Sequence, residues 1–176
     1  KPEMEDLEPI HKSLEERPGV TVIRIEAPDE YRVEVEFSFE DAEAIFRSAS
    51  LLWEAGVVTF EELEDGASLR LYLDIDNYKQ LSTLFPLLDT PVIRAMGPEE
   101  NADITAEDYL SMMGFVLGPD GPPAISESRI IFEVIVDSEL ISQSGGHVEE
   151  DVLIYEVALL DLLLLHEPID LRVVFR

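Results

Sequence analysis

The chain contains no cysteine among its 176 residues. A disulfide framework, a thiolate metal site and a cysteine nucleophile are therefore excluded within this sequence. Histidine is also scarce, since only His11, His147 and His166 occur. His166 is followed by a proline two residues later and by no second histidine at helical spacing, so a zinc-protease helix is not expected there. The composition predicts neither a metal site nor a cofactor.

Positive charge is the second shortage. The 12 lysine and arginine side chains stand against 39 aspartates and glutamates, which gives a formal net charge of −27. Because proteins bind nucleic acids through basic side chains that displace counterions from phosphates, we expect no DNA or RNA partner. The acids run from Glu3 to Asp170 without forming a block, so the negative charge belongs to the surface of a folded domain. Such an excess is typical both of salt-adapted proteins and of very soluble exported ones.

Long hydrophobic runs are missing as well. The longest, at 157–165, reads VALLDLLLL and falls well short of the roughly 20 residues that a membrane-spanning helix requires. Because this run lies between two stretches with a strand pattern, we expect a buried turn of helix packed on a sheet, with Asp161 facing outward or capping a neighbouring element. The alternative is that residues 162–165 are exposed and form a docking patch.

The apolar residues make up 46% of the chain, enough for a hydrophobic core, and their spacing predicts an α+β fold. We predict a curved antiparallel sheet with flanking helices, in a single domain over residues 20–176 that contains a helical insertion over 76–127. Residues 1–19 are predicted to be an N-terminal tether with at most a loose helical turn. The predicted strands lie in 20–39 (two strands), 58–75 (a hairpin turning at Asp65-Gly66), 128–143 (one long strand), 152–159 and 169–176. The predicted helices lie in 39–56, 76–88, 90–97 and 106–118, the last capped by Thr105.

The motifs of catalysis are incomplete. Ser144 and His147 flank two glycines, but the GxSxG turn of serine hydrolases is absent, so we expect a strand connection with a solvated histidine. Asp74, Asp76 and Asn77 have the oxygen donors of a calcium loop without its glycine or its bidentate glutamate. A helix capped by Asp76 explains these residues, and calcium binding is the alternative. We predict that the protein is not an enzyme.

The helical insertion holds more large apolar side chains than such short helices bury on one face. Its two adjacent methionines can repack around varied shapes, and an apolar pocket between helices and a sheet is a frequent ligand site. Ordinary core packing is the alternative. The residues predicted to bind an apolar ligand are Tyr78, Leu81, Phe85, Met96, Tyr109, Met112, Met113 and Phe115.

The last part of the chain, residues 129–176, combines a β-branched strand, a Ser-Gly-Gly break, an aliphatic strand that carries Tyr155, the segment LLDLLL and a final strand. This pattern resembles exported bacterial lipoproteins of the spirochaete type and, more remotely, the LppM-type lipoprotein domain. Asp137 and Ser138 stand where that family usually has Pro-Gly. The resemblance implies a curved sheet with helices, a lipid-binding cavity and a lipidated cysteine upstream of Lys1, which agrees with a chain that begins without methionine.

These features together predict an exported protein of the cell envelope, periplasmic or at the surface, that is attached only through an upstream lipid anchor. Its predicted function is to hold a lipid or acyl chain between the sheet and the helices. The alternative is a non-catalytic structural or adaptor protein that docks an envelope protein through an exposed apolar patch.

Overall fold

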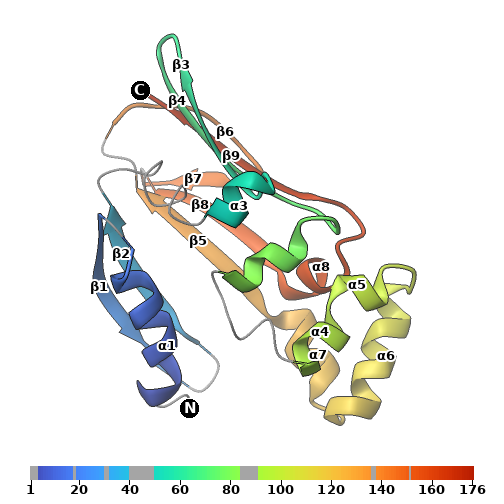
Figure 1. The fold of residues 1–176 in the computed structure, drawn as a ribbon. Coiled ribbons are helices and arrows are strands. Elements are labelled where there is room, and N and C mark those ends of the chain that lie inside the picture. The colour runs from blue at the N-terminus through green and yellow to red at the C-terminus, as the bar shows by residue number, and fades with distance from the viewer. Residues whose placement is uncertain are drawn as a thin grey trace.

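The structure is a computed structural model that describes residues 4–17, 19–29, 32–39, 50–83, 91–135, 138–150 and 152–176. It confirms the α+β class with antiparallel strands (Figure 1). The elements in chain order are α1 (Met4–Glu15), β1 (Val20–Glu26), β2 (Glu34–Phe39), α3 (Ser50–Glu54), β3 (Val58–Leu63), β4 (Gly66–Leu73), η1 (Tyr78–Thr83), α4 (Pro91–Met96), α5 (Pro98–Asn101), α6 (Ala106–Leu117), α7 (Gly121–Glu127), β5 (Arg129–Ile135), β6 (Leu140–Ser144), β7 (His147–Glu149), β8 (Val152–Ala158), α8 (Leu159–Leu164) and β9 (Ile169–Phe175).

The described strands form three hydrogen-bonded sheets rather than one. β1 pairs with β2, a four-stranded sheet has the order β3-β4-β9-β6, and a three-stranded sheet has the order β5-β8-β7. Every pairing is antiparallel. β8 and β9 belong to different sheets, and the short helix α8 carries the chain from one to the other (Figure 1).

The main hydrophobic core lies between the four-stranded and the three-stranded sheet. Leu153 and Tyr155 of β8 and Leu171 and Val173 of β9 point into it, because alternate residues of a strand face the same side. α8 also contributes, since Leu162 packs into this core and the next two leucines are buried as well. Asp161 is exposed. The prediction of a buried helical turn at 157–165 is therefore confirmed, and residues 162–165 are not an exposed patch.

A second core lies among the helices of the insertion. Tyr109 and Met113 of α6 and Ile125 of α7 pack with Leu163 and Leu164 of α8. The predicted start of α6 is confirmed, since the Thr105 side chain accepts a hydrogen bond from the Asp108 amide at 3.1 Å. The described residues between 76 and 127 form helices and turns without a strand, as expected. α7 was not predicted, although its prolines lie in the first turn, where a missing amide hydrogen costs nothing.

The N-terminal segment is more ordered than predicted. The tether was expected to hold a loose turn, whereas α1 is a helix of 12 residues that packs against β1. Leu7 is buried and His11 and Leu14 are half-buried, a spacing that places one face of the helix on the strand. This apolar face outweighs the proline signals, one of which, Pro9, lies inside the helix, so residues 4–15 form a helix where a tether with a loose turn was predicted.

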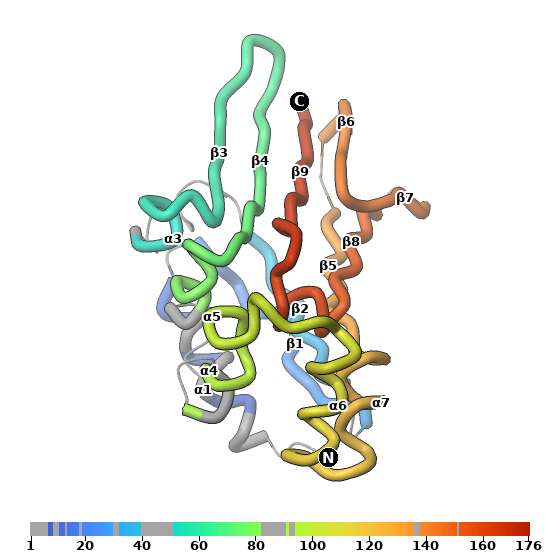
Figure 2. Tube along the Cα trace, turned by 90° about the vertical axis from the view of Figure 1, so that its right-hand side faces the viewer, coloured from blue at the N-terminus to red at the C-terminus, as the bar shows by residue number. Residues whose placement is uncertain are grey.

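One predicted strand is two strands. Residues 128–143 were expected to run as one, but β5 pairs with β8 and β6 pairs with β9 in the other sheet. The chain then turns sharply through Gly145 and Gly146 from β6 into β7, a short strand that was not predicted (Figure 2). Gln143 holds this corner with both ends of its amide, which accepts a hydrogen bond from the Gly146 amide at 3.1 Å and donates one to the Gly146 carbonyl at 2.7 Å. The corner therefore carries the chain from β6, at the edge of the four-stranded sheet, to β7, at the edge of the three-stranded sheet.

Two further predictions lie partly outside the described residues. Of the helix expected over 39–56, the structure describes α3, which is followed by Gly56 with a φ of +69°, the left-handed conformation typical of a glycine after a helix end. The helix expected over 76–88 begins as the 3-10 helix η1, and residues 84–90 are not described. In the described part of the chain, no helix combines the length and the apolar composition needed to cross a membrane.

Candidate functional site

The residues predicted to bind an apolar ligand are divided between the two cores. Phe85 lies outside the described residues, and Phe115 projects into solvent with 90% of its surface exposed. The main core takes Tyr78 and Leu81. The helical core takes Met96, Tyr109, Met112 and Met113. Four of these side chains are buried by protein atoms, and ligand binding by this set stays a prediction.

The two tyrosines mark the contact between the cores. The Tyr109 hydroxyl donates a hydrogen bond to the Met96 carbonyl at 2.8 Å, and burial, followed by the influence of Tyr78, raises the pKa of Tyr109 to about 12. Burial, followed by the negative charge of Glu99, raises the pKa of Tyr78 as well. Both phenols stay neutral at physiological pH and act as packing residues, and the hydroxyl of Tyr109 is satisfied by its hydrogen bond to Met96.

Asp74, not Asp76, caps the turn that begins η1. The Asp74 carboxylate accepts hydrogen bonds from the amides of Asp76 and Asn77 at 3.0 and 3.1 Å, and the Asp74 amide donates to the Asn77 side chain at 2.9 Å. An aspartate that follows a strand readily closes such a turn on the amides two and three residues on, so the predicted cap at Asp76 is wrong. The described residues contain no group of three or more acidic or histidine side chains placed to hold a metal ion.

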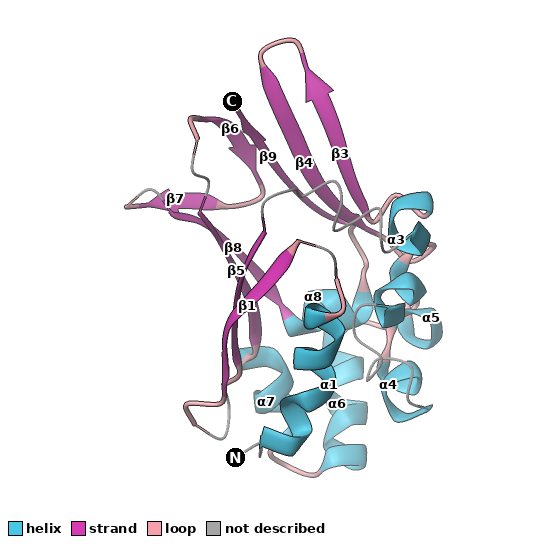
Figure 3. Ribbon diagram, turned by 60° about the vertical axis from the view of Figure 1, so that its left-hand side comes forward, coloured by secondary structure: helices cyan, strands magenta, loops and turns pink. Residues whose placement is uncertain are grey.

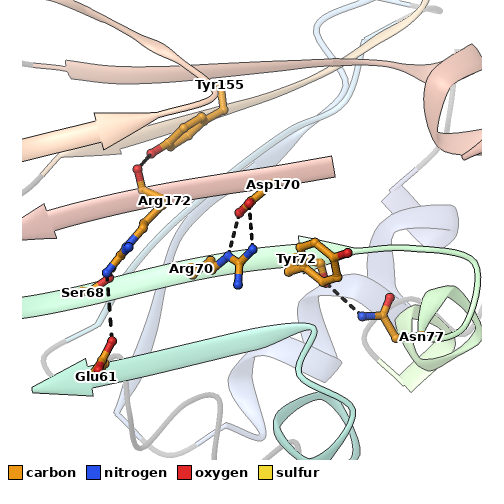
Figure 4. Close-up of polar contacts among 8 residues, drawn as sticks. All are labelled: Glu61, Ser68, Arg70, Tyr72, Asn77, Tyr155, Asp170 and Arg172. Atoms are coloured by element: carbon orange, nitrogen blue, oxygen red, sulfur yellow. Dashed lines mark hydrogen bonds and ion pairs between the residues drawn. The ribbon is translucent and has the colours of Figure 1, made fainter. Parts of the chain in front are cut away.

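The outward face of the four-stranded sheet carries charges that are paired across strands (Figure 4). Arg70 of β4 donates two hydrogen bonds to Asp170 of β9, each at 2.7 Å, and its guanidinium lies 4.7 Å from the centre of the Tyr72 ring. The hydrogen bonds from Arg70 lower the pKa of Asp170, and the same bonds raise the pKa of Arg70. We call this surface the paired face. It consists of Glu61, Ser68, Arg70, Tyr72, Asp170 and Arg172.

Arg172, the second arginine of the paired face, also has partners on other strands. Arg172 donates to the Ser68 hydroxyl at 2.9 Å and lies 4.0 Å from the Glu61 carboxylate. Its backbone carbonyl accepts a hydrogen bond from the Tyr155 hydroxyl at 2.7 Å, which connects the two large sheets through the core (Figure 4). Burial raises the pKa of Tyr155 to about 12. The described charges of this face satisfy one another, which is the arrangement of a structural surface.

The outward face of the three-stranded sheet has a different composition. The register pairs Ile131 with Glu156, Glu133 with Ile154, Ile135 with Val152, His147 with Ile154 and Glu149 with Val152, so all eight side chains lie on one side of the sheet. The opposite side of the same strands carries the buried residues Leu153, Tyr155 and Val157. We call this surface the acidic face. It consists of Ile131, Glu133, Ile135, His147, Glu149, Val152, Ile154 and Glu156.

The acidic face leaves large apolar side chains in water. Ile131 is 55% exposed and Ile135 is 74% exposed. Figure 3 shows the described helices gathered on the other side of β5 and β8, where the core lies, so no helix covers this face. An open hollow of about 490 Å³ is lined by Val152 and Ile154 together with three glutamates. An uncovered apolar surface on a sheet is typical of an interaction site.

Glutamates surround this apolar floor. Glu133 of β5, Glu149 of β7 and Glu150 in the following turn line the hollow. His147 lies 3.6 Å from Glu149, whereas no cation among the described residues forms an ion pair with Glu133, Glu150 or Glu156. Ser144 and His147 are both exposed, and no hydrogen bond joins their side chains in the described structure. The histidine on a glycine-mediated strand connection is solvated, as expected.

The acidic face was not found from the sequence, although the alternation of β5 and β8 was visible there. No family model matches the chain, and no curated protein or solved structure matches it. A functional assignment therefore depends on the residues described above.

Proposed function

We propose that the protein is a non-catalytic docking module whose acidic face binds a segment of a partner protein. One observation carries the proposal, namely the uncovered sheet surface on which exposed isoleucines lie beside a hollow with an apolar floor. Withdrawing such side chains from water stabilises a complex in proportion to the apolar area covered. The filled cores around Tyr109 and Met113 support docking over the enclosed ligand cavity that we first expected.

The charges of the acidic face define the chemistry of the partner segment. Glu133, Glu149 and Glu156, together with Glu150 in the turn beside the face, give this surface a negative potential and are part of the net charge of −27. A matching segment carries lysine or arginine beside branched apolar side chains. Basic and apolar side chains of the segment can reach this face together when the segment is extended, because charged and apolar residues also alternate along the strands of the acidic face.

A pair of peptides tests this proposal. A labelled peptide of alternating valine and lysine is expected to bind in fluorescence anisotropy, with affinity that falls as salt is added. A peptide of alternating valine and glutamate is expected not to bind. If the two peptides bind equally, or if neither binds at low salt, the proposal is wrong.

Variants then locate the site. The triple change E133Q/E149Q/E150Q is expected to weaken binding of the lysine peptide about tenfold, since each lost contact to a charge contributes a fraction of a kcal/mol at an exposed site. The control E54Q/E62Q/E64Q removes the same charge from exposed positions of α3 and the β3-β4 hairpin and is expected to leave binding unchanged. An equal loss in both variants would assign the binding to the overall charge and contradict a site on the acidic face.

The apolar part of the site has its own variant. Ile135→Ser is expected to weaken binding of the peptide at high salt, where the charges are screened. Phe115→Ser removes a side chain that is even more exposed, on a different surface, and serves as the matched control. The envelope location and the upstream lipid anchor stay predictions from the sequence and are not needed for this test.

A further inference from the structure

The stretch from Tyr109 of α6 to Ser126 of α7 is nearly free of charge in a highly charged chain. Charged residues make up 29% of the sequence, yet residues 109–126 include a single one, Asp120. Within this stretch, three consecutive apolar residues at the end of α6 are exposed. We call them the α6 tip: Phe115 (90% exposed), Val116 (61%) and Leu117 (47%).

The three side chains of the α6 tip point in different directions. Successive residues of an α-helix are rotated by about 100° from one another, so residues 115, 116 and 117 spread over about 200° of the helix circumference. A protein groove that receives a helix contacts one face, at positions i, i+3, i+4 and i+7. A groove of that kind would leave part of the α6 tip in water, whereas a fluid apolar phase surrounds all three side chains at once.

The rest of α6 holds this tip in a fixed position. Tyr109 and Met113 pack into the helical core. α7 packs against α6, and a Cβ added to Gly121 would lie 2.6 Å from the Leu117 Cβ, so α7 begins in direct contact with the end of α6. The exposed side chains are therefore presented by a packed helical hairpin.

The α6 tip also lies at an end of the molecule. The turn between α6 and α7 is at the end opposite to the β3-β4 hairpin in three views about the vertical axis, and α1 begins at the same end (Figures 1, 2 and 3). The strands β5, β7 and β8, which carry the acidic face, lie along the side of the molecule in Figure 3, so a surface that contacts the tip leaves the acidic face accessible.

We propose that the α6 tip inserts into the interfacial region of a lipid bilayer with a neutral, zwitterionic surface. The net charge of −27 is repelled by anionic lipid headgroups, and the tip contains no lysine or arginine that would offset this. Three side chains provide weak and reversible binding, because lasting attachment to a membrane takes a second anchor. This inference does not depend on the docking proposal for the acidic face.

The lack of cysteine allows a single reporter to test the insertion. Val116→Cys carries an environment-sensitive fluorophore at the tip, and Ile135→Cys carries the same label on the acidic face as the matched control. On addition of phosphatidylcholine vesicles, the label at position 116 is expected to shift to shorter wavelength and to be quenched by lipids with a shallow spin label. The label at position 135 is expected to stay unchanged. No response at position 116, or an equal response at both positions, would overturn the proposal.

A second change measures the contribution of the aromatic side chain. Phe115→Ser in the labelled protein is expected to weaken vesicle binding roughly tenfold, since burial of a phenylalanine side chain contributes at least that factor. Ile135→Ser is expected to leave vesicle binding unchanged. Binding that requires phosphatidylglycerol would contradict the proposal. So would a response at position 116 that grows with protein concentration without vesicles, because it would place a second copy of the chain on the tip.

Discussion

The paired face and the acidic face are outward surfaces of two sheets in one small protein. They differ in whether their charged side chains form ion pairs. On the paired face, Arg70 is matched to Asp170 and Arg172 to Glu61 across neighbouring strands. On the acidic face, Glu133 lies near two exposed isoleucines and has no described ion-pair partner.

This difference separates what serves the fold from what is left for other molecules. Cross-strand ion pairs contribute to the stability of the sheet that carries them. Unpaired acids around an apolar hollow add self-repulsion instead and stabilise nothing within the chain. The acidic face is therefore the surface where binding of a partner is expected to lower the free energy most. Substitutions at the corner between the two sheets are considered first, and then substitutions on each face.

The largest expected effect is at the corner between β6 and β7. A Cβ on Gly146 would lie 2.5 Å from the Ile154 carbonyl oxygen and 2.6 Å from the Tyr155 ring. Gly146→Ala is therefore expected to lower the free energy of unfolding by about 3 kcal/mol, the upper range for overpacking a filled site. Chemical denaturation followed by circular dichroism measures this.

Gly19→Ala is the control for that change. Gly19 has a φ of +74° with no atom within 4 Å of an added Cβ, so only the backbone conformation is penalised, by about 1 kcal/mol. Equal losses at the two glycines would mean that the corner is not held against β8.

The next effect concerns the hydrogen bond between the two large sheets. Tyr155→Phe removes the hydrogen bond that the Arg172 carbonyl accepts from this hydroxyl and is expected to cost about 1 kcal/mol. The pKa of Tyr155 is raised from 10.0 to about 12, so the folded protein holds the phenol proton more tightly than the unfolded chain. Its contribution is complete below pH 10 and is lost as the pH rises through about 12. Between pH 10 and about 12, the free energy of unfolding is expected to fall less for the variant than for the unchanged protein, as unfolding curves at several pH values would measure.

The sequence predicts local elements of this fold better than their arrangement. The hairpin of β3 and β4 follows from alternation around Asp65-Gly66, and α6 follows from its cap and its helical spacing. Both signals are local. The separation of β5 from β6 depends on pairing with strands far along the chain, and no local pattern encodes it.

The candidate site was hidden for a related reason. β5 reads RIIFEVI, with apolar residues on both faces, so alternation shows that Ile131 and Ile135 lie together but not that their face is the uncovered one. The density of apolar residues in the insertion likewise does not distinguish a core from a pocket. Tyr109 and Met113 were predicted to line a ligand site, and the structure places them together in a packed core.

A smaller effect is expected on the paired face. Asp170→Asn removes the negative charge and one of the two oxygens that accept hydrogen bonds from Arg70, and is expected to cost about 0.5–1 kcal/mol, because the pair is exposed and screened by water. Since the pKa of Asp170 is lowered in the folded state, this contribution is present above the unfolded pKa and is lost as the pH falls through the folded pKa. The variant is therefore expected to lose less stability than the unchanged protein on acidification below pH 3.8.

The smallest effect on stability is expected on the acidic face, and its sign is the informative part. E133Q/E149Q/E150Q keeps the shapes of three side chains and removes three negative charges that face no described cation except His147. Relief of repulsion is expected to leave the free energy of unfolding unchanged or raised, by no more than about 0.5 kcal/mol. Thermal unfolding at low and high salt measures this, because any gain should shrink as added ions screen the acids. A clear loss of stability at both salt concentrations would mean that these acids have partners within the fold. These glutamates would then stabilise the fold as Asp170 does, and their negative charge would no longer support a docking surface.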